Sequence, residues 1–83
     1  MRKEVFDPEV PYEVGQAVAK MRLHLEATID EALPDLDNKP VFIDGAVNTI
    51  IARFCVNYTA GQKIEFDKGY AYYIQNKGFR PAT

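Results

Sequence analysis

Serine and tryptophan are missing from this sequence of 83 residues, and cysteine and histidine occur once each. The lack of serine excludes a serine nucleophile. One cysteine and one histidine cannot build a zinc cage, and one cysteine cannot form an internal disulfide. A lone cysteine is typical of a reducing compartment, so we expect a cytoplasmic protein.

His24 and Cys55 are the one pair that could supply a base and a nucleophile. Both fall on predicted helices of one hairpin, and counting residues from its turn places them about 9 Å apart along the helix axis. Cysteine is also one of the residue types most often buried as a plain apolar group. We therefore predict a structural role for Cys55, no catalytic residues and no enzymatic activity.

Carboxylates and glycines give no sign of a bound ion or cofactor. Glu26 and Asp30 lie four residues apart on the solvated side of a predicted helix, and we interpret them first as solubilising charge. Asp35, Asp37 and Asn38 cluster in a turn, where capping and turn hydrogen bonds explain them better than a calcium loop does. We expect no metal and no cofactor.

The five glycines are scattered singly, so the sequence lacks a phosphate-binding loop and a dinucleotide fingerprint. Gly15 and Gly45 fall inside helical patterns, where each costs about 1 kcal/mol relative to alanine. They either allow a close backbone approach or mark frayed helix starts, and the second interpretation is the one we favour.

What the sequence has is the composition of one small folded domain, residues 1–83: 47% of its residues are hydrophobic and 27% are charged. Residues 1–10 are predicted to form an extended arm, with no apolar signal-peptide core. The net charge of −2 is unevenly placed, because residues 1–38 hold nine acidic against four basic side chains. No apolar run is long enough to predict a membrane span.

Two helices are predicted from apolar periodicity. The first runs from Pro11 to Leu33 and the second from about Pro40 to Ala60, with Gly61 as the C-terminal cap of the second. A short turn joins them, so they should pack as an antiparallel hairpin. The first helix carries an apolar stripe with spacings of four and three residues: Val14, Val18, Met21, Leu25, Thr28 and Ala32.

The C-terminal segment allows two interpretations. Strands at Lys63–Phe66 and Tyr70–Ile74 around the turn Asp67-Lys68-Gly69 would form a β-hairpin, which tyrosine-rich runs favour. The predicted fold class is therefore α+β, an antiparallel two-helix hairpin with a small C-terminal β-hairpin. The alternative is an all-α fold with a short third helix at 67–77, capped by Asp67.

Surplus apolar surface on the second helix predicts a contact with another molecule. We expect a homodimer, and a separate protein partner held mainly by aromatic side chains. The acidic first helix (Glu13, Glu26, Asp30, Glu31) would steer a basic partner or imitate nucleic-acid phosphates. The predicted dimer interface is Leu23, Ala27, Phe42 and Val56. The predicted partner-binding residues are Tyr70, Tyr72, Tyr73, Leu23, Glu26 and Asp30.

These features favour a non-enzymatic protein-binding module: a small regulator, inhibitor or assembly factor that acts by occupying a surface. Its size, its acidic balance and its lack of catalytic groups are typical of small accessory proteins, including phage-borne ones. The alternative is a small dimeric nucleic-acid-binding regulator. It would use the C-terminal segment, in which Lys63, Lys68, Lys77 and Arg80 alternate with aromatic rings.

Overall fold

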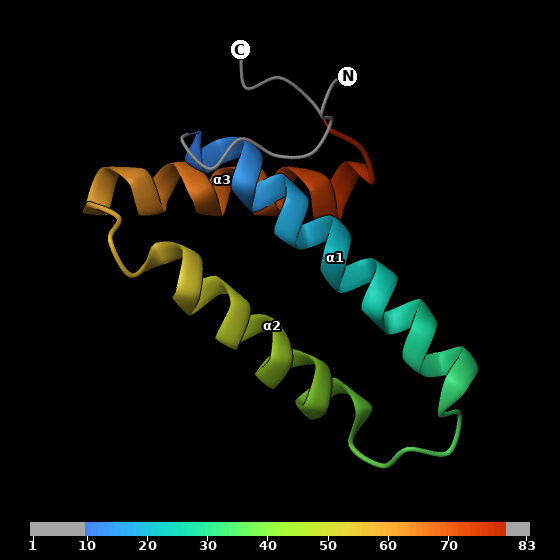
Figure 1. The fold of residues 1–83 in the computed structure, drawn as a ribbon. Coiled ribbons are helices and arrows are strands. Elements are labelled where there is room, and N and C mark those ends of the chain that lie inside the picture. The colour runs from blue at the N-terminus through green and yellow to red at the C-terminus, as the bar shows by residue number, and fades with distance from the viewer. Residues whose placement is uncertain (1–9, 80–83) are drawn as a thin grey trace, which may run out of the picture.

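Three α-helices make up residues 10–79, the part of the chain that the computed structural model describes (Figure 1). Helix α1 spans Pro11–Ala32, α2 spans Lys39–Cys55 and α3 spans Ala60–Asn76. Residues 10–79 contain no β-strand, so the predicted α+β class is wrong and the fold is a small all-α one. Apart from Val10, the arm predicted at residues 1–10 lies outside the described residues.

Prolines set where the first two helices begin. Pro11 is the first residue of α1, where its missing N–H removes no helical hydrogen bond. Helix α1 ends at Ala32, before Pro34, within one residue of the predicted end. Pro40 is the second residue of α2, which follows Asn38 in a left-handed conformation with φ of 57°.

Helix α2 is shorter than predicted, because it ends at Cys55, five residues before the predicted end at Ala60. Thr59 has an extended backbone and forms a capping box with Gln62. The Thr59 hydroxyl accepts a hydrogen bond from the Gln62 backbone N–H at 3.2 Å, and the Gln62 side-chain oxygen accepts one from the Thr59 backbone N–H at 2.9 Å. This arrangement starts a new helix at Ala60. Gly61 is therefore an early residue of α3 and not a C-terminal cap.

Helix α3 replaces the predicted β-hairpin. Phe66, Tyr70 and Tyr73 follow spacings of four and three, which place all three rings on one side of a helix. Lys63 donates to Asp67 one turn later, at 2.9 Å, which a helix allows and a hairpin turn at Asp67 does not. The all-α alternative had the right class, but its helix begins at Ala60 and its cap is Thr59 instead of Asp67.

Helix α3 crosses the N-terminal half of α1, and α2 runs back antiparallel to α1 (Figure 1). At the crossing, a Cβ on Gly15 would overlap the backbone carbonyl of Phe66, and a Cβ on Gly69 would overlap that of Tyr12. Gly15 is therefore a close-approach position, contrary to the interpretation favoured from sequence. Gly45 faces open space.

The core lies where the three helices meet. Five buried side chains form it: Val14, Val18, Ile43, Val47 and Phe66. Half-buried rings of Tyr58 and Tyr70 pack against Phe66, with ring centroids 6.2 and 6.5 Å away. One aromatic side chain of α3 thus fills the space between the two helices of the hairpin.

Candidate functional site

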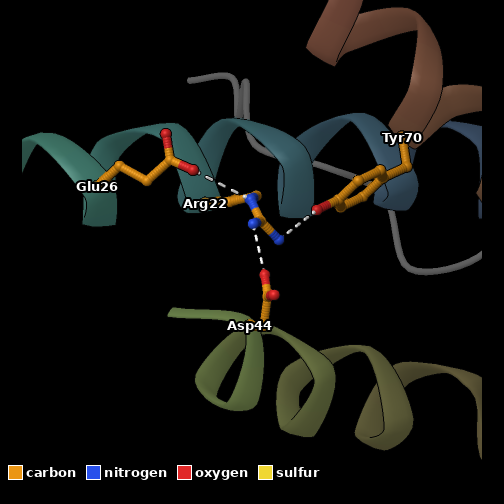
Figure 2. Close-up of polar contacts among 4 residues, drawn as sticks. All are labelled: Arg22, Glu26, Asp44 and Tyr70. Carbon is orange, nitrogen blue, oxygen red and sulfur yellow. Dashed lines mark hydrogen bonds and ion pairs between the residues drawn. The ribbon is translucent and has the colours of Figure 1, made fainter. Parts of the chain in front are cut away.

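Arg22 connects all three helices (Figure 2). Its guanidinium lies on α1 and donates to Asp44 of α2 at 2.6 Å, to Glu26 one turn along α1 at 3.2 Å and to the Tyr70 hydroxyl of α3 at 3.4 Å. These contacts raise the pKa of Arg22 above its ordinary value, with the Asp44 hydrogen bond as the largest cause and the Tyr70 hydrogen bond next. A guanidinium stays charged near neutral pH, so Arg22 itself exchanges no proton and serves to tether the three helices.

An open apolar groove lies beside this cluster, between α1 and α2. Its volume is about 620 Å³. Val18 and Val47 at its floor are buried, while Met21 on its wall is 39% exposed. The lining residues are Val18, Lys20, Met21, Arg22, His24, Leu25 and Thr28 from α1 and Val47 and Ile50 from α2. The groove therefore presents apolar side chains to a ligand from both helices of the hairpin.

The three predicted anchor tyrosines occupy different environments. Tyr73 is buried, with 9% of its surface exposed, and it packs edge-on against Phe79 at 5.0 Å between ring centroids. Tyr70 packs against the core and accepts from Arg22. Tyr72 is half-buried and, with Tyr12, lines a more polar cavity of about 520 Å³. Tyr70 and Tyr72 thus keep part of their surface accessible, whereas Tyr73 belongs to the buried residues.

The other predicted partner residues follow one another on α1 at spacings of three and four, and all of them lie outside the groove lining. Leu23 is half-buried, and it is not among the residues that line the groove. Glu26 is held by Arg22, and Asp30 accepts from Lys39 at 2.9 Å across the ends of α1 and α2. These two carboxylates are therefore partly neutralised.

The predicted dimer residues remain accessible. Phe42 at the start of α2 is 51% exposed, and Val56 just past its end is 73% exposed. Ala27 is exposed, and Leu23 is half-buried. Phe42 and Val56 are fourteen residues apart, which spans about 21 Å of helix. An interface that used both would have to run along the whole of α2.

The bases and rings of the C-terminal segment differ in how accessible they are. Lys63 pairs with Asp67 and Lys68 with Glu65. Phe66, the first ring of the segment, is 1% exposed and cannot stack on a base. Phe79, in contrast, is 53% exposed, so the segment keeps an accessible ring. Arg80 lies outside the described residues.

His24 and Cys55 lie in different surroundings. His24 is exposed on the wall of the groove, and Cys55 packs half-buried against the core. Burial raises the pKa of the Cys55 thiol, which opposes formation of the nucleophilic thiolate. Among residues 10–79 no group of three potential metal ligands comes together. No described helix has the length and apolar character needed to cross a membrane.

The groove is the feature that sequence reasoning missed. Periodicity places Met21, Leu25 and Thr28 on one apolar stripe of the first helix, but it does not indicate a groove. Their exposure depends on how far α2 covers α1, which no local pattern encodes. No family model matches this chain, and comparison with curated proteins and with solved structures gives no match either.

Proposed function

We propose that this chain is a small, non-enzymatic protein-binding module whose groove between α1 and α2 receives an apolar helical segment of another protein. The groove itself supports this proposal. Apolar grooves between two helices commonly bind amphipathic helices, which insert side chains at positions i, i+3, i+4 and i+7. By covering such a segment of its partner, the module would act as a regulator, inhibitor or assembly factor.

The size of the groove suits this role. Its α1 wall runs from Val18 to Thr28, which spans about 15 Å, or nearly three turns of a bound helix. Val47 and Ile50 supply the opposite wall. A helix with two or three apolar anchors would cover the exposed part of Met21 and exclude water from the groove.

A charge placed in the groove tests the proposal. The probe is a fluorescent amphipathic peptide of about 15 residues with a leucine and alanine face, a length near the minimum for an isolated helix. We expect Met21→Glu to weaken its binding, measured by fluorescence anisotropy, because the carboxylate would be desolvated against the apolar face. The matched control is Ile64→Glu on α3, which is 54% exposed and away from the groove lining.

Equal binding by wild type and Met21→Glu, with both folded by circular dichroism, would rule out the groove as the binding site. If Ile64→Glu weakened peptide binding to the same degree, the added negative charge, and not a change in the groove, would explain the weaker binding. The cytoplasm remains the proposed compartment, supported by the single cysteine.

The proposed homodimer is supported by the exposure of Phe42 and Val56. Apolar side chains that stay exposed in a folded chain are often covered in an assembly. Sedimentation equilibrium at micromolar concentration is the test, and a single species of 9.4 kDa would remove the dimer from the proposal. The nucleic-acid alternative is less well supported than the groove, because Lys63 and Lys68 are paired and Phe66 is buried.

A further inference from the structure

We infer that two copies of this chain pair through the outer face of α2, antiparallel, about a two-fold axis that passes near Thr49. The inference rests on the homodimer of the proposed function and adds the surface and the orientation. Residues at alternating spacings of three and four lie on one side of a helix. The outer face consists of Phe42, Gly45, Thr49, Ala52 and Val56.

The rest of the chain leaves the outer face open. All five of its residues are exposed, Phe42 by 51% and Val56 by 73%, and Val56 still has the backbone conformation of a helix. Ile43 and Val47, on the opposite side of α2, are buried in the core. Within residues 10–79, α1 and α3 lie on that side and no element covers the other (Figure 1). The most apolar of the three helices therefore keeps a whole face in water.

Gly45 lowers the stability of α2 for no reason that the single chain supplies. Glycine inside a helix is less favourable than alanine, and a glycine kept there usually serves packing. Gly15 and Gly69 each lie against the backbone of a neighbouring helix, whereas nothing lies within 4 Å of a Cβ added to Gly45. The φ of Gly45 is not positive, so no left-handed turn requires glycine either. A second backbone that approaches the outer face from outside the chain explains it.

Thr49, in the middle of the outer face, can be covered without leaving an unpaired polar group. Its hydroxyl already donates to the Gly45 carbonyl at 2.9 Å, within α2. Burial of a hydroxyl that lacks a hydrogen-bond partner would oppose association. Because Thr49 makes this bond inside its own helix, the outer face needs no polar group from the molecule that covers it.

The charges of α2 favour a copy of the same face as the partner. Lys39 pairs with Asp30 of α1, and Asp44 pairs with Arg22 of α1, so neither charge belongs to the outer face. Arg53 flanks it. In an antiparallel pair the two copies of Arg53 lie about 12 Å apart along the helix axis, beyond the screening length of about 8 Å. Two such faces meet without unpaired charges, whereas a charged partner would find no counter-charge there.

The sizes of the side chains read the same in both directions along the outer face. Phe42 and Val56 stand at its ends, and the small Gly45 and Ala52 lie between them on either side of Thr49. A two-fold axis near Thr49 places Phe42 beside the partner subunit's Val56, and Gly45 beside the partner subunit's Ala52. An interface between identical chains needs such a self-complementary patch. Antiparallel helices also oppose their dipoles favourably.

Sedimentation equilibrium from about 1 to about 100 µM tests the surface. We expect Thr49→Glu to raise the dimer dissociation constant at least about tenfold, because the axis brings two carboxylates together in an apolar contact. Ile64→Glu is the matched control, since it adds the same charge at an exposed position of α3 and should leave the constant unchanged. Gly45→Ala should weaken the dimer while it stabilises the monomer, a combination that general destabilisation does not produce.

Disulfide cross-linking in a Cys55→Ala background tests the orientation. Under oxidation Thr49→Cys should form a covalent dimer, because the axis brings its two copies together. Val56→Cys should not, since its copies lie about 21 Å apart in an antiparallel pair and a disulfide needs Cα atoms within about 7 Å. A parallel pair would cross-link both variants.

Each outcome has a separate meaning. Wild type that stays monomeric over the whole concentration range overturns the dimer, and the inference falls with it. A dimer that Thr49→Glu leaves intact, or that Ile64→Glu weakens equally, with all variants folded by circular dichroism, overturns the assignment to the outer face. Cross-linking of Val56→Cys overturns the antiparallel order. The groove proposal is tested separately, because none of the substituted residues lines the groove.

Discussion

Gly15 and Gly69 occupy the crossing of α1 and α3, each against the backbone of the other helix. A side chain on Gly15 would meet the Phe66 carbonyl, and a side chain on Gly69 would meet the Tyr12 carbonyl. Backbone cannot move aside as a flexible side chain does. The absence of these two Cβ atoms therefore fixes how closely the two helices pack.

Gly15→Ala and Gly69→Ala should each destabilise the fold. Overpacking typically costs about 1–3 kcal/mol or more, which exceeds the gain of about 1 kcal/mol in helix propensity. Gly45→Ala is the matched control, because nothing lies near its added Cβ, and it should stabilise by up to about 1 kcal/mol. Urea unfolding followed by circular dichroism measures all three. Stabilisation by Gly15→Ala would contradict the close crossing.

Thr59→Ala should weaken the start of α3. It removes the hydroxyl that accepts from Gln62 and so breaks half of the capping box. Loss of such a cap costs about 1 kcal/mol. Thr49→Ala is the comparison, since the Thr49 hydroxyl only donates to the Gly45 carbonyl within α2. Alanine there should be neutral or slightly stabilising. Equal free energies of unfolding for the two variants would argue against the cap.

Asp44→Asn should loosen the tether between α1 and α2. The Asp44 carboxylate is 55% exposed, so its pair with Arg22 is screened by solvent and contributes about 0.5–1 kcal/mol. Asp67→Asn breaks a pair within one helix and should cost about 0.3–0.5 kcal/mol. Because the Asp44 pair joins two helices, its loss should also speed hydrogen exchange in α2. Unchanged hydrogen exchange in α2 would show that apolar packing, and not the ion pair with Arg22, holds α2 against α1.

Stability should fall in alkaline solution. Burial raises the pKa of Cys55 above its ordinary value of 9.0 and that of Tyr58 above 10.0. The unfolded chain therefore loses these protons first. The contribution of each group is complete below its unfolded pKa, and it is lost as the pH rises through the folded pKa. The hydrogen bond from Lys63 to Asp67 raises the pKa of Lys63 and acts in the same direction.

Urea midpoints measured from pH 7 to pH 11 check this sign, with a decline expected above about pH 9. Tyr58→Phe should reduce the decline at the upper end of the range, because it removes one of the titrating groups. A midpoint that rises between pH 9 and pH 11 would contradict the directions given for both groups.

Local sequence patterns were enough for the first half of the chain. Pro11 and Pro34 bracket α1, and the stripe from Val14 to Thr28 identifies its apolar side. Pro40 marks the start of α2 in the same way. Proline geometry and side-chain periodicity act within one helix, so they can be recognised without knowing the neighbours.

The C-terminal segment could not be assigned in this way. Its tyrosines favour strands, and Asp67-Lys68-Gly69 is a good hairpin turn, yet the segment is helical. The capping box at Thr59 was a local signal that was overlooked. The role of Gly69 was not local, because this residue serves the crossing with Gly15 some fifty positions away.

The composition of the chain, without any coordinates, excludes a serine nucleophile, a disulfide and a cysteine–histidine metal cage. Those conclusions need only the identity of the side chains. Whether Met21 and Thr28 face the core or a groove, and whether Tyr73 is an anchor or part of the core, was decided by how α2 and α3 lie against α1. Packing between distant segments sets that geometry, since the same apolar stripe can be covered or left open without any change in its pattern.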